Sequence, residues 1–245
     1  PHIQRIYSFF DSKDKTKKQN EGRFVNGLKE GIWTSYFPNG NKKSEITYVN
    51  NKQNGYAKIY YENGKVAEEG IVLLKNSGNL LPVDASKYNK IAVIGENATR
   101  RMSMGGGSSS LKPHLEVSPL TGLKAKFGDK ITYSLGYASG PPAWGREIPS
   151  KLNADSLRNA AVKLAQASEL VIFVGGLNKN HFQDCEGGDR LSYNLPFGQD
   201  QLLSEILKVN QKVVVVLISG NAVAMPWIGQ APSVVQAWYL GSEAG

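Results

Sequence analysis

The sequence predicts an α/β protein, with a mostly parallel, doubly wound sheet sandwich preceded by a small antiparallel β-hairpin region. Three observations support this prediction. The chain has 245 residues and 40% hydrophobic content, which is typical of a globular, core-forming protein. Residues 21–68 repeat with a period of 24 residues. From residue 69 onward, continuous runs of Val, Ile and Leu alternate with amphipathic helical stretches.

The first 20 residues are expected to form a flexible basic leader. Residues 1–70 hold 12 basic and 8 acidic side chains of a chain whose net charge is +8. A lysine cluster within the first 20 residues suits a solvated segment. A nucleic-acid or anionic-membrane surface would need the same charge, but we favour the solvated leader. The clustered residues are Lys13, Lys15, Lys17 and Lys18.

The repeat in residues 21–68 is expected to form stacked hairpins. Asn-Gly is a strong hairpin signal, because both central residues of a type I′ turn need positive φ. Trp33–Phe37 and Lys58–Tyr61 supply flanking strand residues, so we expect a small antiparallel meander. The residues that recur are Gly31 and Gly55, Tyr36 and Tyr60, Asn39-Gly40 and Asn63-Gly64, and Glu45 and Glu69.

Residues 69–135 begin the alternation of strands with helices. The segment Ile71–Asn76 is apolar and closes into a turn at Leu80-Leu81-Pro82, and Lys90–Gly95 reads as a buried strand. A Gly/Ser loop over 105–110 follows. Ser118 is the expected N-cap of a helix that has Pro at its first position, and a strand is expected over Ile131–Leu135.

The remaining chain supplies two helices and three strands. The helix expected over Asp155–Ala167 places its apolar residues on one face, namely Leu157, Ala160, Ala161, Leu164 and Ala165. Another helix is expected over 199–209. Strands are expected over 170–174, 213–218 and 234–238. Such continuous apolar runs favour strands that are buried on both faces, and therefore a mostly parallel sheet with helices on both sides.

Several familiar kinds of site are absent from the sequence. The glycines over 105–107 do not directly follow a strand as Gly-x-Gly-x-x-Gly, and no Gly-Lys-Ser/Thr occurs, which argues against nucleotide binding. The three histidines are scattered, and no Gly-x-Ser-x-Gly elbow is present. The single cysteine, Cys185, excludes an internal disulfide and is interpreted as a small packed side chain. No apolar run approaches the roughly 18 residues that would span a bilayer.

The loop over residues 184–190 is the strongest candidate for chemistry. It holds Asp184, Glu186, Asp189 and Arg190 within seven residues and follows a buried strand. Ligands of open parallel sheets bind beyond the carboxyl ends of the strands. Glu186 precedes two glycines that would let a sugar approach closely, whereas Asp189 and Arg190 suit a pair that supports the loop. From composition alone, a salt-bridged loop carboxylate is the better interpretation of Glu186.

Two family resemblances change that interpretation. The sequence of Gly31–Gly40, followed by Glu45 and Tyr48, resembles the variant MORN repeats. Residues 69–245 resemble the C-terminal domain of glycoside hydrolase family 3, the β-glucosidase and β-xylosidase family. The second resemblance is carried, in order, by Glu69–Asn76, Leu80–Pro82, Ile91–Gly95, Gly105–Ser108 with Ser118–Leu120, Glu186–Arg190, Leu195-Pro196, Gln199, Ser219–Val223, Pro226-Trp227 and Ala237–Tyr239.

The second resemblance implies a function and a partner. In that family a TIM barrel supplies an Asp nucleophile, and the second domain completes the pocket for retaining hydrolysis of β-linked oligosaccharides or glycosides. Glu186 falls where relatives place the general acid/base. Gly106, Gly107 and Ser108 fall on a substrate-binding wall, although Gly107 stands where an aromatic residue would be sought. The resemblance implies no cofactor or metal, no nucleic acid, and a periplasmic or extracellular location.

The same resemblance exposes departures from the family pattern. A (β/α)₈ barrel needs roughly 200 residues or more, so residues 1–68 cannot hold one. The chain begins at Pro1 without Met, and the family continues through another helix and strand after Gly245. We therefore expect a fragment that is truncated at its end and inactive alone. The alternative is a non-catalytic carbohydrate- or protein-binding module.

Overall fold

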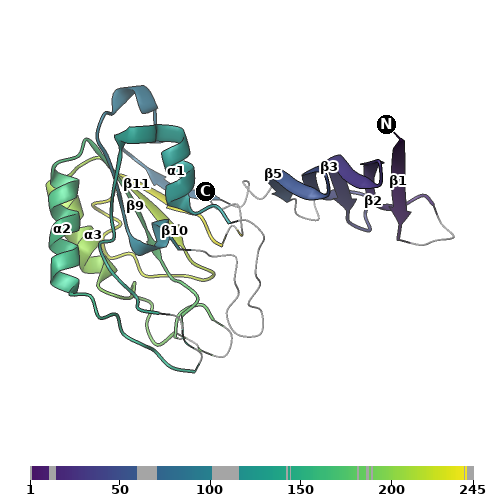
Figure 1. Cartoon of the computed structure of the whole chain (residues 1–245). Helices are drawn as coiled ribbons and strands as arrows, with labels where there is room; N and C mark the ends of the chain where they lie inside the picture. Colours follow the sequence, from purple (N-terminus) through teal and green to yellow (C-terminus); the bar gives the residue numbers. More distant parts are fainter. Residues whose placement is uncertain are drawn as a thin grey trace. The chain divides into compact units, whose positions relative to one another are not determined.

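The computed structural model describes residues 2–10, 15–59, 71–100, 116–141, 143, 145–180, 182–185, 188, 190–239 and 241. The chain divides into two compact units, Pro1–Gly70 and Ile71–Gly245. Figure 1 shows an antiparallel sheet in the first unit and a helix-covered sheet in the second. No helix in the described part of the chain is long and apolar enough to cross a membrane.

The first unit is a five-stranded antiparallel meander. Its strands are β1 (Ile3–Phe9), β2 (Lys18–Val25), β3 (Leu28–Tyr36), β4 (Lys42–Val49) and β5 (Lys52–Ile59), and they pair in sequence order (Figure 1). The predicted meander is confirmed. The structure differs in the first 20 residues, where β1 pairs with β2 from Ile3 opposite Val25 onward. The lysine cluster that follows β1 concealed this edge strand, although Ile3, Ile6, Tyr7 and Phe9 lie within it.

An aromatic cluster holds one face of this sheet. The Trp33 ring lies between Phe24 and Tyr48, at centroid distances of 5.1 and 6.4 Å. The Lys29 ammonium lies 4.4 Å from the centre of the Trp33 ring. Gly22 lies directly beneath this indole, so a Cβ at that position would collide with the ring. The sheet therefore obtains its packing from cross-strand aromatic contacts on a single layer.

The turn chemistry differs from the prediction. Asn39-Gly40 lies in a five-residue connection, closed by bonds from Phe37 N–H to Asn41 O and from Gly40 N–H to Phe37 O. Positive φ at both central residues, as a type I′ turn requires, occurs instead at Asn26-Gly27 and Asn50-Asn51. These two tight turns join β2 to β3 and β4 to β5. Asn63-Gly64 lies outside the described residues.

The second unit is a six-stranded sheet with helices on both faces. Its elements are β6 (Val72–Asn76), β7 (Ile91–Ile94), α1 (Pro119–Phe127), β8 (Ile131–Ser134), α2 (Ala154–Gln166), β9 (Leu170–Gly176), α3 (Gln199–Val209), β10 (Val213–Ile218) and β11 (Ser233–Gln236), with short 3₁₀ turns at Ala85–Lys87, Glu96–Ala98 and Gly128–Lys130. The strand order is β6-β11-β10-β9-β7-β8. Only β6 pairs antiparallel, with β11, so the predicted α/β sandwich with a mostly parallel sheet is confirmed.

Two apolar cores explain why the sheet is covered on both sides. Val171 and Phe173 of β9 pack with residues of α2 and α3, whereas Leu170 and Ile172 pack with Leu120 of α1. In Figure 1, α2 and α3 stand on one side of the strands and α1 on the other. All seven residues of β9 are buried, as expected for a central parallel strand.

The helices begin close to the predicted positions. The Ser118 hydroxyl accepts a hydrogen bond from Thr121 N–H at the start of α1, as predicted. Helix α2 is capped by Asn153 and starts at Ala154, one residue before the expected start. The predicted apolar face of α2 is wrong at Ala160, which is exposed, while Val162 packs against the core. A methyl group is too small a signal to define a face, and the tilt of the helix on the sheet decides which residues are covered.

Gln199 fixes the carboxyl end of β9. This side chain is fully buried at the start of α3, where its carbonyl accepts from Gly176 N–H at 2.8 Å and its amide donates to Gly176 O at 2.9 Å. Gly176 has a φ of 121°, and a Cβ there would collide with the carbonyl of Ile218. One amide side chain thus satisfies both backbone groups of the residue at which β9 ends.

Replacement of Gln199 by Leu is expected to lower the free energy of unfolding by about 2 to 4 kcal/mol, because the buried N–H and C=O of Gly176 lose their partners. Gln201→Leu is the matched control, since Gln201 is exposed on the same helix; its effect should stay within about 0.5 kcal/mol. Urea denaturation measures both, and amide exchange at Gly176 should accelerate only in the first variant. Equal losses of unfolding free energy in the two variants would show that the two Gln199–Gly176 hydrogen bonds do not stabilise the fold.

Candidate functional site

The candidate site lies at the carboxyl edge of the parallel sheet. Strands β7, β9 and β10 end there, and the described residues that follow them are 95–100, 177–180, 182–185, 188, 190–198 and 219–232. Ligands of open parallel sheets bind at this edge. Most of the predicted site residues lie outside the described residues: Glu186, Gly106, Gly107, Ser108 and Asp189. Arg190 is described, as are Asp184, Cys185 and Gly188, which flank Glu186 and Gly187.

Cys185 and Gly188 are held beside each other. They form an isolated antiparallel bridge, and the Cys185 thiol lies 3.9 Å from Gly188 O. The cysteine is partly buried. The prediction of a small packed side chain is in keeping with this geometry. The bridge fixes the backbone on either side of the position that Glu186 occupies in the sequence.

Asp184 ties this loop to the segments that follow β10 and β11. Its carboxylate accepts from Gly220 N–H at 2.6 Å, from the Asn221 side-chain amide at 2.5 Å and from the Tyr239 hydroxyl at 2.8 Å. Its own N–H donates to Asn178 O at 3.0 Å. Hydrogen bonds to an ionised acceptor are short and about twice as strong as neutral ones. The carboxylate therefore clamps the loop after β9 to the segments that follow β10 and β11.

Tyr239 and Lys179 complete the clamp. Burial, together with the negative charge of Asp184, raises the pKa of Tyr239 far above its ordinary value, so the phenol keeps its proton and stays a donor. The Lys179 ammonium lies 3.7 Å from the centre of the Tyr239 ring, a cation–π distance. Burial lowers the pKa of Lys179, and the nearby Asp184 opposes this shift.

The Arg190 side chain contacts the segment that follows β10. Its Nη2 donates to Ala222 O at 2.5 Å, and the guanidinium lies 5.3 Å from the centre of the Tyr193 ring. Among the described residues its Nη1 has no hydrogen-bond partner. The predicted pair with Asp189 lies outside the described residues. The contacts of Arg190 that the structure describes therefore connect the loop to the backbone of its neighbour.

A second network holds the base of the loop after β7. Arg100, the last described residue before that loop, pairs with Glu96 at 3.3 Å and donates to Asn180 Oδ1 at 3.2 Å and to Gly140 O at 3.1 Å. It also contacts the Ser139 hydroxyl, and Glu96 accepts from Ser139 N–H at 3.0 Å. The ion pair is mostly buried, with side-chain exposures of 19% for Arg100 and 14% for Glu96. The network joins three loops at the sheet edge.

The sequence did not predict the role of these anchoring residues. Asp184 was one of several carboxylates in its loop, and Lys179 and Arg100 had no motif around them. Asp184 and Tyr239 are 55 positions apart, so no local pattern connects them. No group of three or more His, Cys, Asp or Glu side chains in the described part of the chain is arranged to hold a metal ion. The described geometry is that of two braced loop bases at the carboxyl edge of the parallel sheet.

Known families match both units of the chain. The family model of the glycosyl hydrolase family 3 C-terminal domain matches residues 71–245. The model of the MORN repeat variant matches residues 29–50 and 53–72. The repeats that the sequence resembled are therefore present, and so is the domain that follows them.

Individual relatives agree with the family match. The beta-glucosidase BoGH3A of Bacteroides ovatus is 58% identical over 187 residues, which are 74% of this chain and 25% of that protein. A beta-xylosidase of Formosa agariphila is 36% identical over 192 residues, which are 74% of this chain and 24% of that protein. The chain thus spans about a quarter of the length of these curated relatives.

Solved structures show the same fold. The GH3 beta-glucosidase of Bifidobacterium adolescentis has a TM-score of 0.57 and 32% identity, covering 72% of this chain and 24% of that one. A beta-glucosidase of Kluyveromyces marxianus has a TM-score of 0.64 at 22% identity, covering 73% of this chain and 37% of that one. The second likeness bears on the fold alone.

Asp184→Asn is expected to lower the free energy of unfolding by about 1 to 3 kcal/mol, because an amide nitrogen would face the donors of Asn221 or Gly220 and the charge would be lost. Asp155→Asn is the matched control, since Asp155 forms an ion pair with Arg158 while its side chain is 74% exposed; its loss should stay below about 1 kcal/mol. Urea denaturation compares the two, and amide exchange at Gly220 reports on the clamp itself. A change at Asp155 as large as that at Asp184 would contradict the role of the clamp.

Proposed function

The chain belongs to glycosyl hydrolase family 3 through its C-terminal domain, and we propose that this domain supplies Glu186 as the general acid/base in retaining hydrolysis of β-glycosides. The observation that carries the proposal is the match of residues 71–245 to the family model, together with 58% identity to a beta-glucosidase. The loop that contains Glu186 leaves β9 at the carboxyl edge of the sheet, where a ligand would bind.

Retaining hydrolysis requires an acid/base carboxyl group that is held in a fixed position. In a retaining glycosidase one carboxyl protonates the leaving oxygen and then deprotonates water, while a second, about 5 to 5.5 Å from the first, attacks the anomeric carbon of the sugar. Misplacement of a catalytic group by about 1 Å can cost about a hundredfold in rate. The Asp184 clamp and the Cys185–Gly188 bridge lie on either side of Glu186 in the chain. Both support a loop that is held for this purpose, and Asp184 is the positioning residue.

The second carboxyl group is proposed to come from a TIM-barrel domain outside residues 1–245. A barrel needs roughly 200 residues or more, and residues 1–70 form the hairpin unit instead. The chain spans about a quarter of the length of its curated relatives, which leaves room in a relative for such a domain. The substrate class is a β-linked oligosaccharide or glycoside, as the names of the beta-glucosidase and beta-xylosidase relatives suggest.

Glu186→Gln tests the role of the acid/base. The chain is combined with the barrel domain of the Bacteroides ovatus relative and assayed on two aryl β-glucosides. With phenyl β-glucoside, whose leaving group needs a proton, the substitution should lower kcat/KM by about 10² to 10⁴-fold. With dinitrophenyl β-glucoside the loss of kcat/KM should be far smaller, and added azide should restore turnover, because azide needs no general base.

The control variant is Glu147→Gln, since Glu147 is exposed and lies outside the proposed machinery; it should retain full activity. Unchanged kinetics of Glu186→Gln on phenyl β-glucoside would reject the assignment. Turnover by the chain without any barrel, abolished by the same substitution, would reject the need for a second domain. Binding of oligosaccharides without turnover in either setting would favour the alternative, a non-catalytic binding module.

A further inference from the structure

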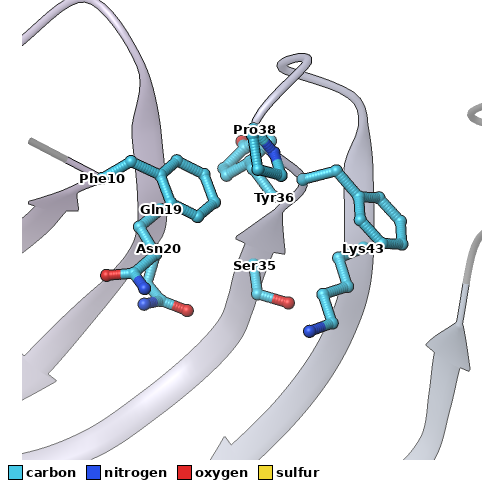
Figure 2. Close-up of a pocket in the computed structure, with 8 residues that line it drawn as sticks. Phe10, Gln19, Asn20, Ser35, Tyr36, Pro38 and Lys43 are labelled. Carbon is cyan, nitrogen blue, oxygen red and sulfur yellow. The ribbon is translucent and has the colours of Figure 1, made fainter. Parts of the chain in front are cut away.

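The N-terminal sheet carries a pocket of about 330 Å³ at one end of its hairpins. Figure 2 shows Phe10 on one side of the pocket, Gln19 and Asn20 on the neighbouring strand, and Ser35 and Lys43 farther across. The pocket lies where β1 gives way to β2 and β3 gives way to β4. It belongs to the first unit alone and lies apart from the loops that follow β7, β9 and β10.

Apolar rings form two walls of the pocket. Phe10 is 41% exposed at the end of β1. Phe37 and the exposed Pro38 follow β3. The ends of β1 and β3 are two strand spacings apart, about 9.5 Å, with the start of β2 between them, so one flat, amphipathic ring would lie over β2 with an apolar wall on either side. An exposed phenylalanine beside a second apolar wall offers stacking surfaces that the sheet does not need for its own packing.

The backbone fixes both walls in place. Phe10 N–H donates to Lys17 O at 3.1 Å. Phe37 N–H donates to Asn41 O at 2.8 Å, and Gly40 N–H donates to Phe37 O at 2.9 Å. These bonds hold the backbone of Phe10 and of Phe37 at the strand ends, so less backbone entropy is lost when a ligand stacks on their rings.

Polar groups line the space between the walls. The Asn20 amide donates to Ser8 Oγ at 3.0 Å, which occupies one of its hydrogen-bonding positions. The Ser35 and Ser44 hydroxyls share a bond of 2.6 Å. Tyr36 donates to Glu21. Burial and this bond raise the pKa of Tyr36 to about 12, so it stays protonated at neutral pH. Neutral amides and hydroxyls thus dominate the polar lining.

The exposed residues Gln19 and Lys43 complete that lining. Figure 2 shows Gln19 beside Asn20 on one strand and Lys43 on the far side of Ser35. The Lys43 ammonium lies 5.8 Å from the centre of the Phe37 ring, and Lys43 is the single charged side chain among the eight lining residues. An anionic lipid headgroup is generally held by several cations. The pocket is therefore better suited to a neutral polar ligand than to a phosphate.

A pyranose ring has the matching chemistry, with C–H faces that stack on apolar rings and a rim of hydroxyls that pair with amides and hydroxyls. We propose that this pocket binds a sugar unit of a β-linked glycan and so adds a carbohydrate-binding site to the chain. The β-linkage rests on the proposed function of the second unit, whereas the pocket chemistry is independent of it. The N-terminal sheet would then hold the glycan on which the enzyme acts.

The test titrates the full-length chain with cellotetraose and xylotetraose by NMR, and every variant also carries Glu186→Gln so that hydrolysis cannot interfere. Saturable binding is expected, with shifts at the amides of Ser35 and Lys43. Phe37→Ala and Phe10→Ala should each weaken it about five- to tenfold through lost stacking. Gln19→Ala changes an exposed side chain that the fold does not need, and should also weaken binding. The matched control is Tyr7→Ala, an aromatic on β1 that is 45% exposed and outside the pocket; its affinity should be unchanged.

The absence of saturable binding would overturn the proposal, and so would an equal loss in Tyr7→Ala and Phe37→Ala. Vesicles of phosphatidylserine and phosphatidylcholine provide the competing arm. Sedimentation with these vesicles that depends on Lys43, without any binding of oligosaccharide, would assign the pocket to a membrane surface and overturn the proposal. The titration records no turnover. Failure of the catalytic proposal would therefore leave a positive result here intact, and a negative result here would leave the role of Glu186 untouched.

Discussion

The arrangement of the candidate site depends on the end of β9. Every residue of this strand is buried, and its last residue is held by both hydrogen bonds of the Gln199 side chain. A buried backbone group without a partner is costly, so this pairing fixes where the strand stops and where its loop begins. The two glycines that end β7 and β9, Gly95 and Gly176, have positive φ and no room for a Cβ. The chain therefore turns sharply where β7 and β9 end.

Charged side chains hold the segments that follow these strands. Asp184 joins the loop after β9 to Gly220, Asn221 and Tyr239, while Arg100 and Glu96 join the loop after β7 to its neighbours. Removing one partner of a buried ion pair leaves the other uncompensated. Such networks hold loops in a defined place without covering them. The proposed role of Glu186, opposite a carboxyl group of another domain, would require such an arrangement.

Much of the fold could be predicted from local sequence. The period of 24 residues indicated the hairpins, and the Val/Ile/Leu runs indicated a parallel sheet, because strands buried on both faces show no alternation. Ser118 capped α1 and Gln199 began α3 as predicted. The family resemblance, and not the composition, singled out Glu186, and its catalytic role stays a prediction. Edge strand β1 and both tight turns were missed. Asn26-Gly27 carries the strong Asn-Gly signal but was passed over for Asn39-Gly40, and Asn50-Asn51 is a weaker signal than Asn-Gly.

The sequence by itself therefore determined the class of fold, the two units and the family of the second, since periodicity and motifs are local properties of the chain. Only the tertiary structure decided which side chains brace the site. Asp184 and Tyr239 are 55 positions apart, and Gln199 reaches Gly176 across 23. The pocket likewise brings together Phe10 and Phe37, which follow different strands of the N-terminal sheet. Contacts of this kind depend on strand order and register, which chain folding sets and no local pattern records.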